Sequence, residues 1–277
     1  MTRIFVLGVV SLTAALVACR GDAARVDAAT PASTPVPQAV SAPERLTVRV
    51  LARYPHDREA FTQGLLWHDG KLYESTGLYA QSSIRRVDLK TGKVEAQAPL
   101  QPTLFGEGLA LVGDDLVQLT WREGRALRWS RAALALAGES RYDGEGWGLT
   151  FDGHHLIQSD GSARLTFRDP ATFAVTSTLD VTDDGHPVSL LNELELVDGA
   201  LYANIWTTDE IVRIDPATGR VTARIDASPL REELMGQNIA DDAVLNGIAW
   251  RPETKTFLLT GKLWPTLFEV QLVPAGG

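Results

Sequence analysis

The sequence predicts an all-β protein, a five-bladed β-propeller, from two observations. First, five segments repeat one pattern: a polar residue, then Gly or Glu, then an aliphatic residue within a β-rich run. The aliphatic positions are Leu65, Leu109, Leu149, Leu194 and Ile248, spaced much as in four-stranded propeller blades. Second, 24 glycines and 14 prolines interrupt short apolar runs, as many tight turns require. A plain β-sandwich would not explain a fivefold recurrence.

Each repeat predicts four strands in the same order. In the first repeat, a strand at 61–67 leads through the turn 68–70, which carries an Asp-Gly hairpin signal, into a second strand at 72–75. A third strand at 84–89 ends in a glycine-bearing turn, and a fourth strand leads to the next repeat. The following repeats keep this order, so each of them predicts one blade.

The fifth repeat lacks its fourth strand. It contains strands at 245–250, 256–260 and 266–272, whereas an extra strand at 46–51 precedes the first repeat. We expect this N-terminal strand to complete the last blade and close the ring, because closure leaves no long edge unpaired.

Composition excludes several classes of protein. The chain is 44% hydrophobic and 22% charged, which is typical of a globular protein rather than a disordered one. A net charge of −9 without basic clusters argues against nucleic-acid binding. One cysteine excludes an intramolecular disulfide framework and a CxxC zinc site.

Residues 1–18 predict a lipoprotein signal peptide. A positive start is followed by an apolar run at 4–18, which is too short to span a bilayer comfortably. The run ends in Leu-Val-Ala-Cys19, which resembles the lipobox of bacterial lipoproteins, where the cysteine becomes the acylated N-terminus. Because Arg20 follows rather than Asp, the same rule implies the outer membrane. An ordinary signal peptide with an incidental cysteine is the alternative.

The rest of the chain then divides in two. Residues 19–44 contain the lipidated Cys19 and an Ala-, Pro- and Thr-rich stretch, which predicts a disordered tether. Residues 45–277 form the propeller domain. We expect an exported protein on the periplasmic side, attached to the membrane only through the lipid on Cys19, and a monomer.

The residues that open the repeats should converge at one mouth of the central channel, where the loops between blades arrive. They are Gln63, Glu107, Trp147, Asn192 and Asn246. The second strands should add Trp121, Trp206 and Lys262 at the same depth. The result is a pocket with a carboxylate, an ammonium group, amides and indoles.

Two long loops, 181–190 and 223–244, should cover the same mouth and provide a lid or a pocket wall. The second loop predicts a short helix with Ser228 as its N-cap and Pro229 at the first helical position.

Motifs in these repeats resemble the plant and bacterial type of glutaminyl-peptide cyclotransferase (glutaminyl cyclase). The resemblance runs in order from about Tyr54 to Leu272, with no motif missing. The family is known as a five-bladed propeller, in agreement with the repeats. The resemblance implies conversion of an N-terminal glutamine to pyroglutamate with release of ammonia. The motifs lie at 61–65, 73–79, 105–108, 118–121, 146–149, 159–162, 191–195, 203–206 and 259–265.

The resemblance also implies roles for single residues. Glu107 resembles the catalytic acid and base, and either Lys262 or Asn192 could stabilise the oxyanion. The substrate-binding positions are polar at Gln63, Asn192 and Lys262 and aromatic at Trp121, Trp147, Trp206, Phe61 and Phe105. Glu74 is expected behind the site, as a partner of Arg85 or Arg86.

No metal or cofactor is implied. The five histidines show no zinc-ligand spacing; His56 is expected in a loop, and His154 and His155 in a hairpin turn. Two other functions are possible: a non-catalytic propeller that binds peptides, and a metal-dependent, lactonase-like propeller hydrolase. The set of Glu107, Asn192 and Lys262 favours the enzyme, because a simple binding protein has no need of it. The expected partners are peptides or exported proteins that begin with glutamine.

Overall fold

The structure is a computed structural model that describes residues 11, 14, 42–240 and 242–276. The signal peptide predicted at 1–18 (except for residues 11 and 14), Cys19 and nearly all of the tether lie outside these described residues, and the boundaries proposed for them stay predictions. No helix in the described part of the chain is long and apolar enough to cross a membrane.

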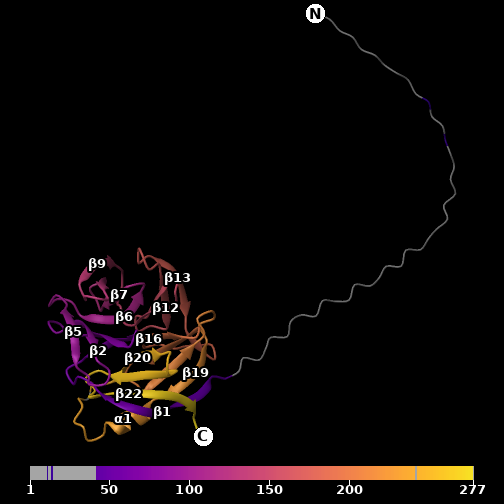
Figure 1. Cartoon of the computed structure of the whole chain (residues 1–277). Helices are drawn as coiled ribbons and strands as arrows, with labels where there is room; N and C mark the ends of the chain where they lie inside the picture. Colours follow the sequence, from indigo (N-terminus) through magenta and orange to yellow (C-terminus); the bar gives the residue numbers. More distant parts are fainter. Residues whose placement is uncertain (1–10, 12–13, 15–41, 241, 277) are drawn as a thin grey trace, which may run out of the picture. The chain divides into compact units, whose positions relative to one another are not determined.

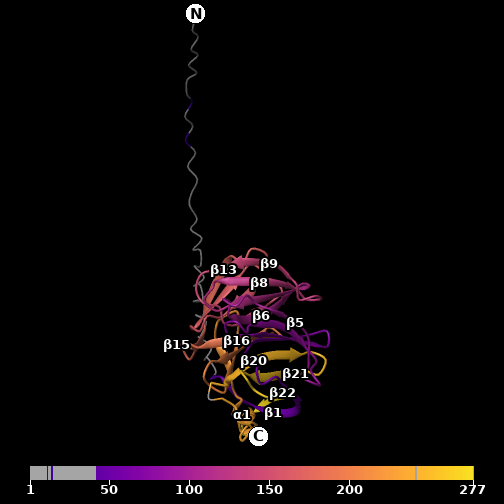
Figure 2. The same cartoon turned by 90° about the vertical axis from the view of Figure 1, so that its left-hand side faces the viewer.

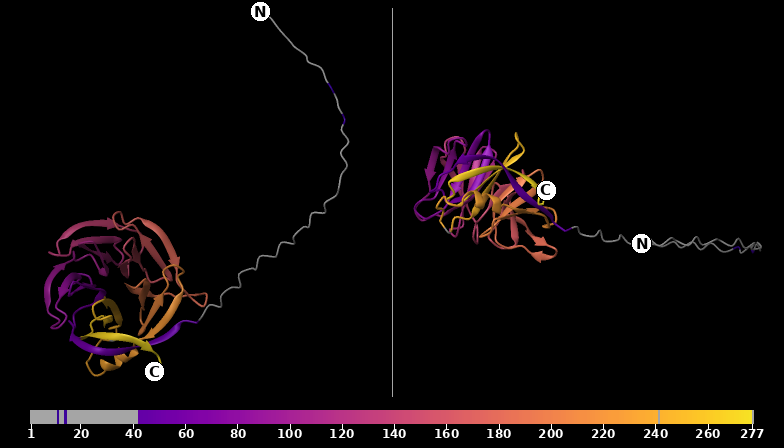
Figure 3. Two further views of the ribbon diagram at one scale, coloured as in Figure 1. Left: turned by 45° about the vertical axis from the view of Figure 1, so that its right-hand side comes forward. Right: turned by 90° about the horizontal axis from the view of Figure 1, so that it is seen from below.

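The domain consists of four-stranded antiparallel blades that follow one another around a central axis (Figure 1, Figure 2). The first view of Figure 3 shows the ring, whose colours run from indigo through magenta and orange to yellow. The predicted five-bladed propeller is confirmed. The first blade contains β2 (Thr62–His68), β3 (Lys71–Thr76), β4 (Ser83–Val87) and β5 (Val94–Pro99). The second contains β6 (Gly106–Val112), β7 (Asp115–Thr120), β8 (Arg125–Ser130) and β9 (Leu136–Arg141).

The other blades repeat this order. The third contains β10 (Leu149–Phe151), β11 (Leu156–Gln158), β12 (Arg164–Arg168) and β13 (Val175–Asp180). The fourth contains β16 (Leu191–Val197), β17 (Ala200–Ile205), β18 (Glu210–Ile214) and β19 (Val221–Asp226). The fifth contains β20 (Leu245–Arg251), β21 (Thr256–Gly261), β22 (Thr266–Pro274) and the N-terminal β1 (Glu44–Pro55).

Strand β1 closes the ring as predicted. It runs antiparallel to β22, with Leu46 opposite Pro274, and so completes the fifth blade. Its first residues also pair in parallel with β19, with Glu44 opposite Ala223. The fourth and fifth blades therefore form one eight-stranded sheet, a continuity that the repeats did not predict.

The repeated glycine lets neighbouring first strands approach closely at the centre. A Cβ atom on Gly108 would lie 2.5 Å from the amide nitrogen of Leu149, and one on Gly148 would lie 2.0 Å from the carbonyl oxygen of Asn192. In the fourth blade Glu193 takes this place. Its buried carboxyl group reaches across the channel and accepts hydrogen bonds from the backbone N–H groups of Leu65 and Ile248.

Two details of the long loops differ from expectation. The helix α1 (Ser228–Glu233) has Ala227 as its N-cap, whereas the N–H group of Ser228 donates to the side chain of Asp226. The loop 181–190 folds into the hairpin β14 (Thr182–Asp183) and β15 (His186–Pro187), which lies beside β19. It lies there because the side chain of Arg224 on β19 binds Asp183.

Candidate active site

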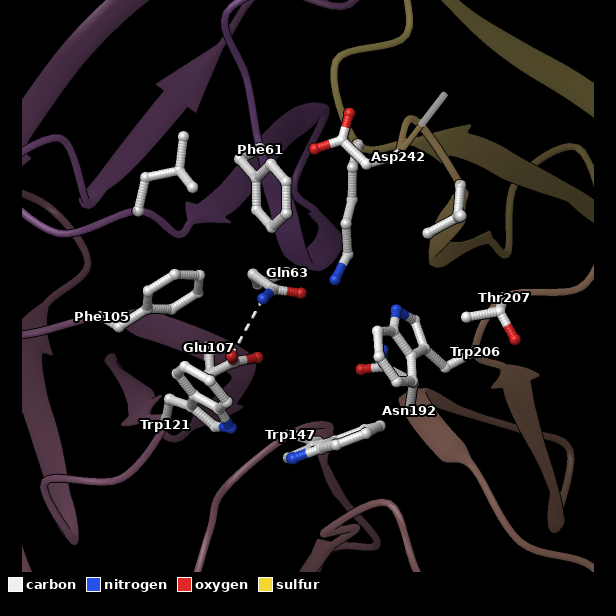
Figure 4. A pocket seen from close by; sticks show the side chains of 13 residues that line it. Phe61, Gln63, Phe105, Glu107, Trp121, Trp147, Asn192, Trp206, Thr207 and Asp242 are labelled. Carbon is white, nitrogen blue, oxygen red and sulfur yellow. Dashed lines mark hydrogen bonds between the residues drawn. The ribbon is translucent and has the colours of Figure 1, made fainter. Parts of the chain in front are cut away.

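A cavity of about 560 Å³ lies at the mouth where the repeat-opening residues meet (Figure 4). It collects every residue that the sequence assigned to catalysis or substrate binding. These are Phe61, Gln63, Phe105, Glu107, Trp121, Trp147, Asn192, Trp206 and Lys262. Leu78, Thr207, Asp242 and Val244 complete the lining.

An irregularity in the first strands turns the polar side chains into this cavity. The pairing of the first and second strands shifts register at the repeat-opening residue in four blades. A bulge of this kind re-aims a side chain that regular alternation would place elsewhere. The residues inside the shifts are Gln63, Glu107, Asn192 and Asn246. In the third blade, Trp147 lies just before β10 instead.

Serines of neighbouring blades hold two of these bulges in place. The hydroxyl group of Ser75 donates to the carbonyl oxygen of Glu107, and that of Ser159 donates to the carbonyl oxygen of Asn192. Each serine therefore ties the backbone of a site residue to the blade before it.

Glu107 is the carboxyl group at the floor of the cavity, with 4% of the residue exposed. One of its oxygens accepts a hydrogen bond of 2.9 Å from the side-chain amide of Gln63 (Figure 4). Burial raises its pKa well above the usual range, and this outweighs the lowering effect of the Lys262 ammonium group. Glu145 and Glu123 raise it further. A buried carboxyl group whose pKa is raised holds a proton more readily than an exposed one, as a group that must both accept and return a proton requires.

Lys262 is the cationic group of the cavity. Its Nζ lies 4.8 Å from the centre of the Phe61 ring, and its backbone N–H donates to Val244. Burial lowers the pKa of the ammonium group, whereas Glu107 and Asp242 raise it. A Lys262 that keeps its proton supplies a positive charge in a poorly solvated place, where charge interactions are strong.

Aromatic rings form the wall around these groups. Phe105 contacts Phe61 and Trp121 with ring centres 6.1 and 5.5 Å apart, and Trp147 meets the edge of Trp206 at 5.3 Å. Trp206 is 37% exposed and therefore stands at the rim. The cavity can hold a small polar group between apolar surfaces and keep most water away from it.

A family model described as glutamine cyclotransferase matches residues 22–272. The chain belongs to the glutamine cyclotransferase family. It is 41% identical over 230 residues to a glutaminyl-peptide cyclotransferase of Arabidopsis thaliana, covering 82% of this chain and 72% of the relative. It is also similar to a crystal structure of Myxococcus xanthus glutaminyl cyclase, with 43% identity and a TM-score of 0.80. That match covers 84% of this chain and 99% of the other.

Glu74 lies behind the cavity of this glutamine cyclotransferase family member rather than in it. Its carboxylate binds Arg85 and His56, both at 3.0 Å, and accepts a hydrogen bond from the hydroxyl group of Thr62. Burial opposes its ionisation, but Arg85 and His56 outweigh burial and lower the pKa of Glu74 to about 2. Of the two partners named from the sequence, Arg85 is correct; Arg86 binds Glu95 instead.

This buried group of charges reaches the site through the backbone. Thr62 precedes Gln63, and Nδ1 of His56 contacts the carbonyl oxygen of Trp264, two residues after Lys262, at 2.7 Å. His56 therefore has a structural role in its loop, and it links the first blade to the fifth.

Some site residues were missed or misplaced from the sequence. Asn246 opens the fifth repeat but does not line the cavity; its amide donates to the carbonyl oxygen of Thr62. Among the residues of the two long loops that the structure describes, Asp242 and Val244 at the end of the second line the cavity, and none of loop 181–190 does. The sequence could have indicated Leu78 and Thr207 as lining residues, because each lies in or beside a family motif.

Within residues 42–240 and 242–276, no three His, Cys, Asp or Glu side chains group as metal ligands.

Proposed function

We propose that this protein is a glutaminyl-peptide cyclotransferase, which converts the N-terminal glutamine of peptides and proteins to pyroglutamate and releases ammonia. The observation that carries the proposal is Glu107, a buried carboxyl group of raised pKa beside Lys262 in an aromatic cavity, in a chain of this family.

The reaction needs one proton to move from one nitrogen to another. The free α-amine attacks the side-chain carbonyl carbon of the glutamine, and a C–N bond closes the five-membered lactam. Glu107 accepts the proton that the attacking nitrogen loses and returns it to the side-chain nitrogen. The bond to that nitrogen then breaks, and ammonia leaves. A single carboxyl group suffices because it takes up the proton in the first step and gives it back in the second.

The other residues bind and stabilise. Lys262 and the side-chain amide of Asn192 lie along the same cavity and can donate to the carbonyl oxygen as it gains negative charge. Gln63 holds one Glu107 oxygen in place. The aromatic wall binds the glutamine side chain in a bent form, so that the amine already lies near the carbonyl carbon. These groups supply the acid, the base and the positive charge without a metal or cofactor.

The test is incubation of the full chain with a peptide that begins with glutamine. The expected result is release of ammonia together with the matching loss of mass from the peptide. The same peptide with an acetylated N-terminus is the control, because it lacks the nucleophile. Binding without ammonia release would refute the proposal and favour the alternative, a peptide-binding propeller.

We also propose that the chain is exported and anchored on the periplasmic side of the outer membrane by a lipid on Cys19. The apolar run at 4–18 and its Leu-Val-Ala-Cys ending support this proposal. Fatty-acid labelling should mark the wild-type chain and leave Cys19→Ala unlabelled. An unlabelled wild-type chain would instead indicate an ordinary signal peptide. The monomeric state stays a prediction, which light scattering on the purified chain can check.

A further inference from the structure

Glu145 joins two tryptophans of the cavity wall, although no motif discussed above assigns it a role. It lies in the loop between β9 and β10. Its Oε2 accepts hydrogen bonds from the indole nitrogen of Trp121 at 2.8 Å and from that of Trp147 at 3.0 Å. Figure 4 shows the two indoles side by side, with their nitrogens near each other. One carboxylate oxygen thus connects the walls contributed by the second and third blades.

Further contacts fix this carboxylate. Its other oxygen accepts a hydrogen bond of 3.0 Å from Arg122, whose guanidinium group lies 3.7 Å from the centre of the Trp121 ring. The side-chain amide of Gln158 donates to the carbonyl oxygen of Glu145. The next residue is Gly146, where a Cβ atom would lie 2.2 Å from the hydroxyl oxygen of Tyr142. The backbone beside Glu145 therefore has little room to shift.

The indoles have little freedom on their other sides. Trp147 lies against Gly161, where a Cβ atom would come within 2.7 Å of its ring, and it meets the edge of Trp206. Trp121 packs against Phe105. An indole N–H group needs an acceptor when it is half buried, and a charged acceptor makes the stronger bond. Glu145 therefore supplies the charged acceptor of both indole N–H groups.

We propose that Glu145 is a positioning residue, which holds Trp121 and Trp147 as one rigid wall against which the substrate glutamine folds into its reactive shape. The proposal rests on the function proposed above. It predicts that the loss of Glu145 weakens productive binding of the glutamine side chain more than it weakens the fold, because both indoles remain but lose their common acceptor.

The charge of Glu145 provides a second, independent test of the proposal. Among the groups that act on Glu107, burial, Glu145 and Glu123 raise its pKa and Lys262 lowers it. Removing the Glu145 charge should therefore move the acidic limb of the pH dependence of kcat/KM to lower pH. A residue that only supported the fold would not shift this limb.

The experiment compares Glu145→Ala, Glu145→Gln and the control Asp143→Asn in the full chain. Asp143 is an exposed carboxylate in the same loop and contributes no pocket lining. We expect KM to rise about 10-fold in Glu145→Ala, since two charge-assisted bonds are lost. Glu145→Gln should recover most of this rise, because an amide oxygen can accept from the same indoles. Both variants should shift the acidic limb of the pH dependence of kcat/KM. Asp143→Asn should change neither KM nor this limb.

Indole N–H resonances of ¹⁵N-labelled protein provide a readout that does not depend on turnover. Two of them should move in Glu145→Ala and stay in place in Asp143→Asn. Unmoved resonances, an unchanged KM in Glu145→Ala, or an equal effect of Asp143→Asn would overturn the proposal. A wild-type chain that forms no pyroglutamate refutes the proposed function instead, and movement of the two resonances would then still support the contact.

Discussion

Replacement of Glu107 by glutamine is the most direct test of the proposed chemistry. Glutamine has nearly the same shape, so it fills the same buried space, and its side-chain oxygen can still accept the hydrogen bond from Gln63. What it cannot do is exchange a proton with the attacking and leaving nitrogens. The substitution therefore separates proton transfer from packing.

The expected loss follows from the role of the group. General acid–base catalysis by one side chain contributes about 10² to 10⁴ in rate, which corresponds to roughly 3–5 kcal/mol of activation free energy. We expect kcat to fall at least about 10²-fold in Glu107→Gln. The free energy of unfolding should not fall, because a buried carboxyl group of raised pKa disfavours the folded state as it ionises, and an amide does not ionise.

The assay measures ammonia release and thermal unfolding on the same preparation. A variant with near wild-type kcat would refute the assignment of Glu107 as acid and base. A variant with lower melting temperature and unchanged kcat would instead give Glu107 a structural role. The acid–base assignment would then move to a water molecule held by Lys262, because Glu74 lies behind the cavity and is paired with Arg85 and His56.

Four further predictions concern other residues and conditions. Glu74→Ala removes the carboxylate shared by Arg85 and His56 and leaves Arg85 with Asp57 alone, and it should lower the free energy of unfolding by about 3–5 kcal/mol in urea titration. Glu195 has a pKa raised to about 8 by burial, so its contribution to stability is present below its ordinary pKa of 4.5 and is lost as the pH rises towards 8. Unfolding curves of Glu195→Gln should lack this part of the pH dependence. A peptide that begins with glutamate should react far more slowly than its glutamine counterpart, because an ionised carboxylate resists attack; equal rates would contradict the lactam mechanism. EDTA should leave turnover intact, and zinc-dependent recovery of lost activity at unchanged melting temperature would contradict the role given to Glu107.

The repeats predicted the blades and most members of the site because each blade repeats one hydrogen-bonded pattern with a site residue at its opening, whereas Phe61 and Phe105 were predicted from the family resemblance alone. The repeats could not predict how far each side chain turns. Gln63 and Asn246 open their repeats alike, but only Gln63 lines the cavity, because the amide of Asn246 satisfies the carbonyl oxygen of Thr62. Such a choice depends on which backbone groups lie within reach after folding.

Contacts between distant loops were also beyond prediction. Glu145 lies in the loop between β9 and β10, at a position that does not recur in the other repeats. Its role depends on two indole nitrogens that come together only in the folded ring. The parallel pairing of β1 with β19 adds to a strand that the repeats had already assigned to the fifth blade, and no pattern in Glu44 to Thr47 signals a second partner.

The position of β1 has a consequence for how the protein comes to be folded. The strand is synthesised before every strand it pairs with: Arg49 donates a hydrogen bond to Gln271, 222 positions further along the chain. Blades one to four can form as local hairpins while synthesis proceeds, but the fifth blade, in which β1 pairs with β22, stays incomplete until β22 arrives. Completion of the ring is therefore among the last events of folding. It brings the side of the cavity that carries Gln63 against the side that carries Lys262.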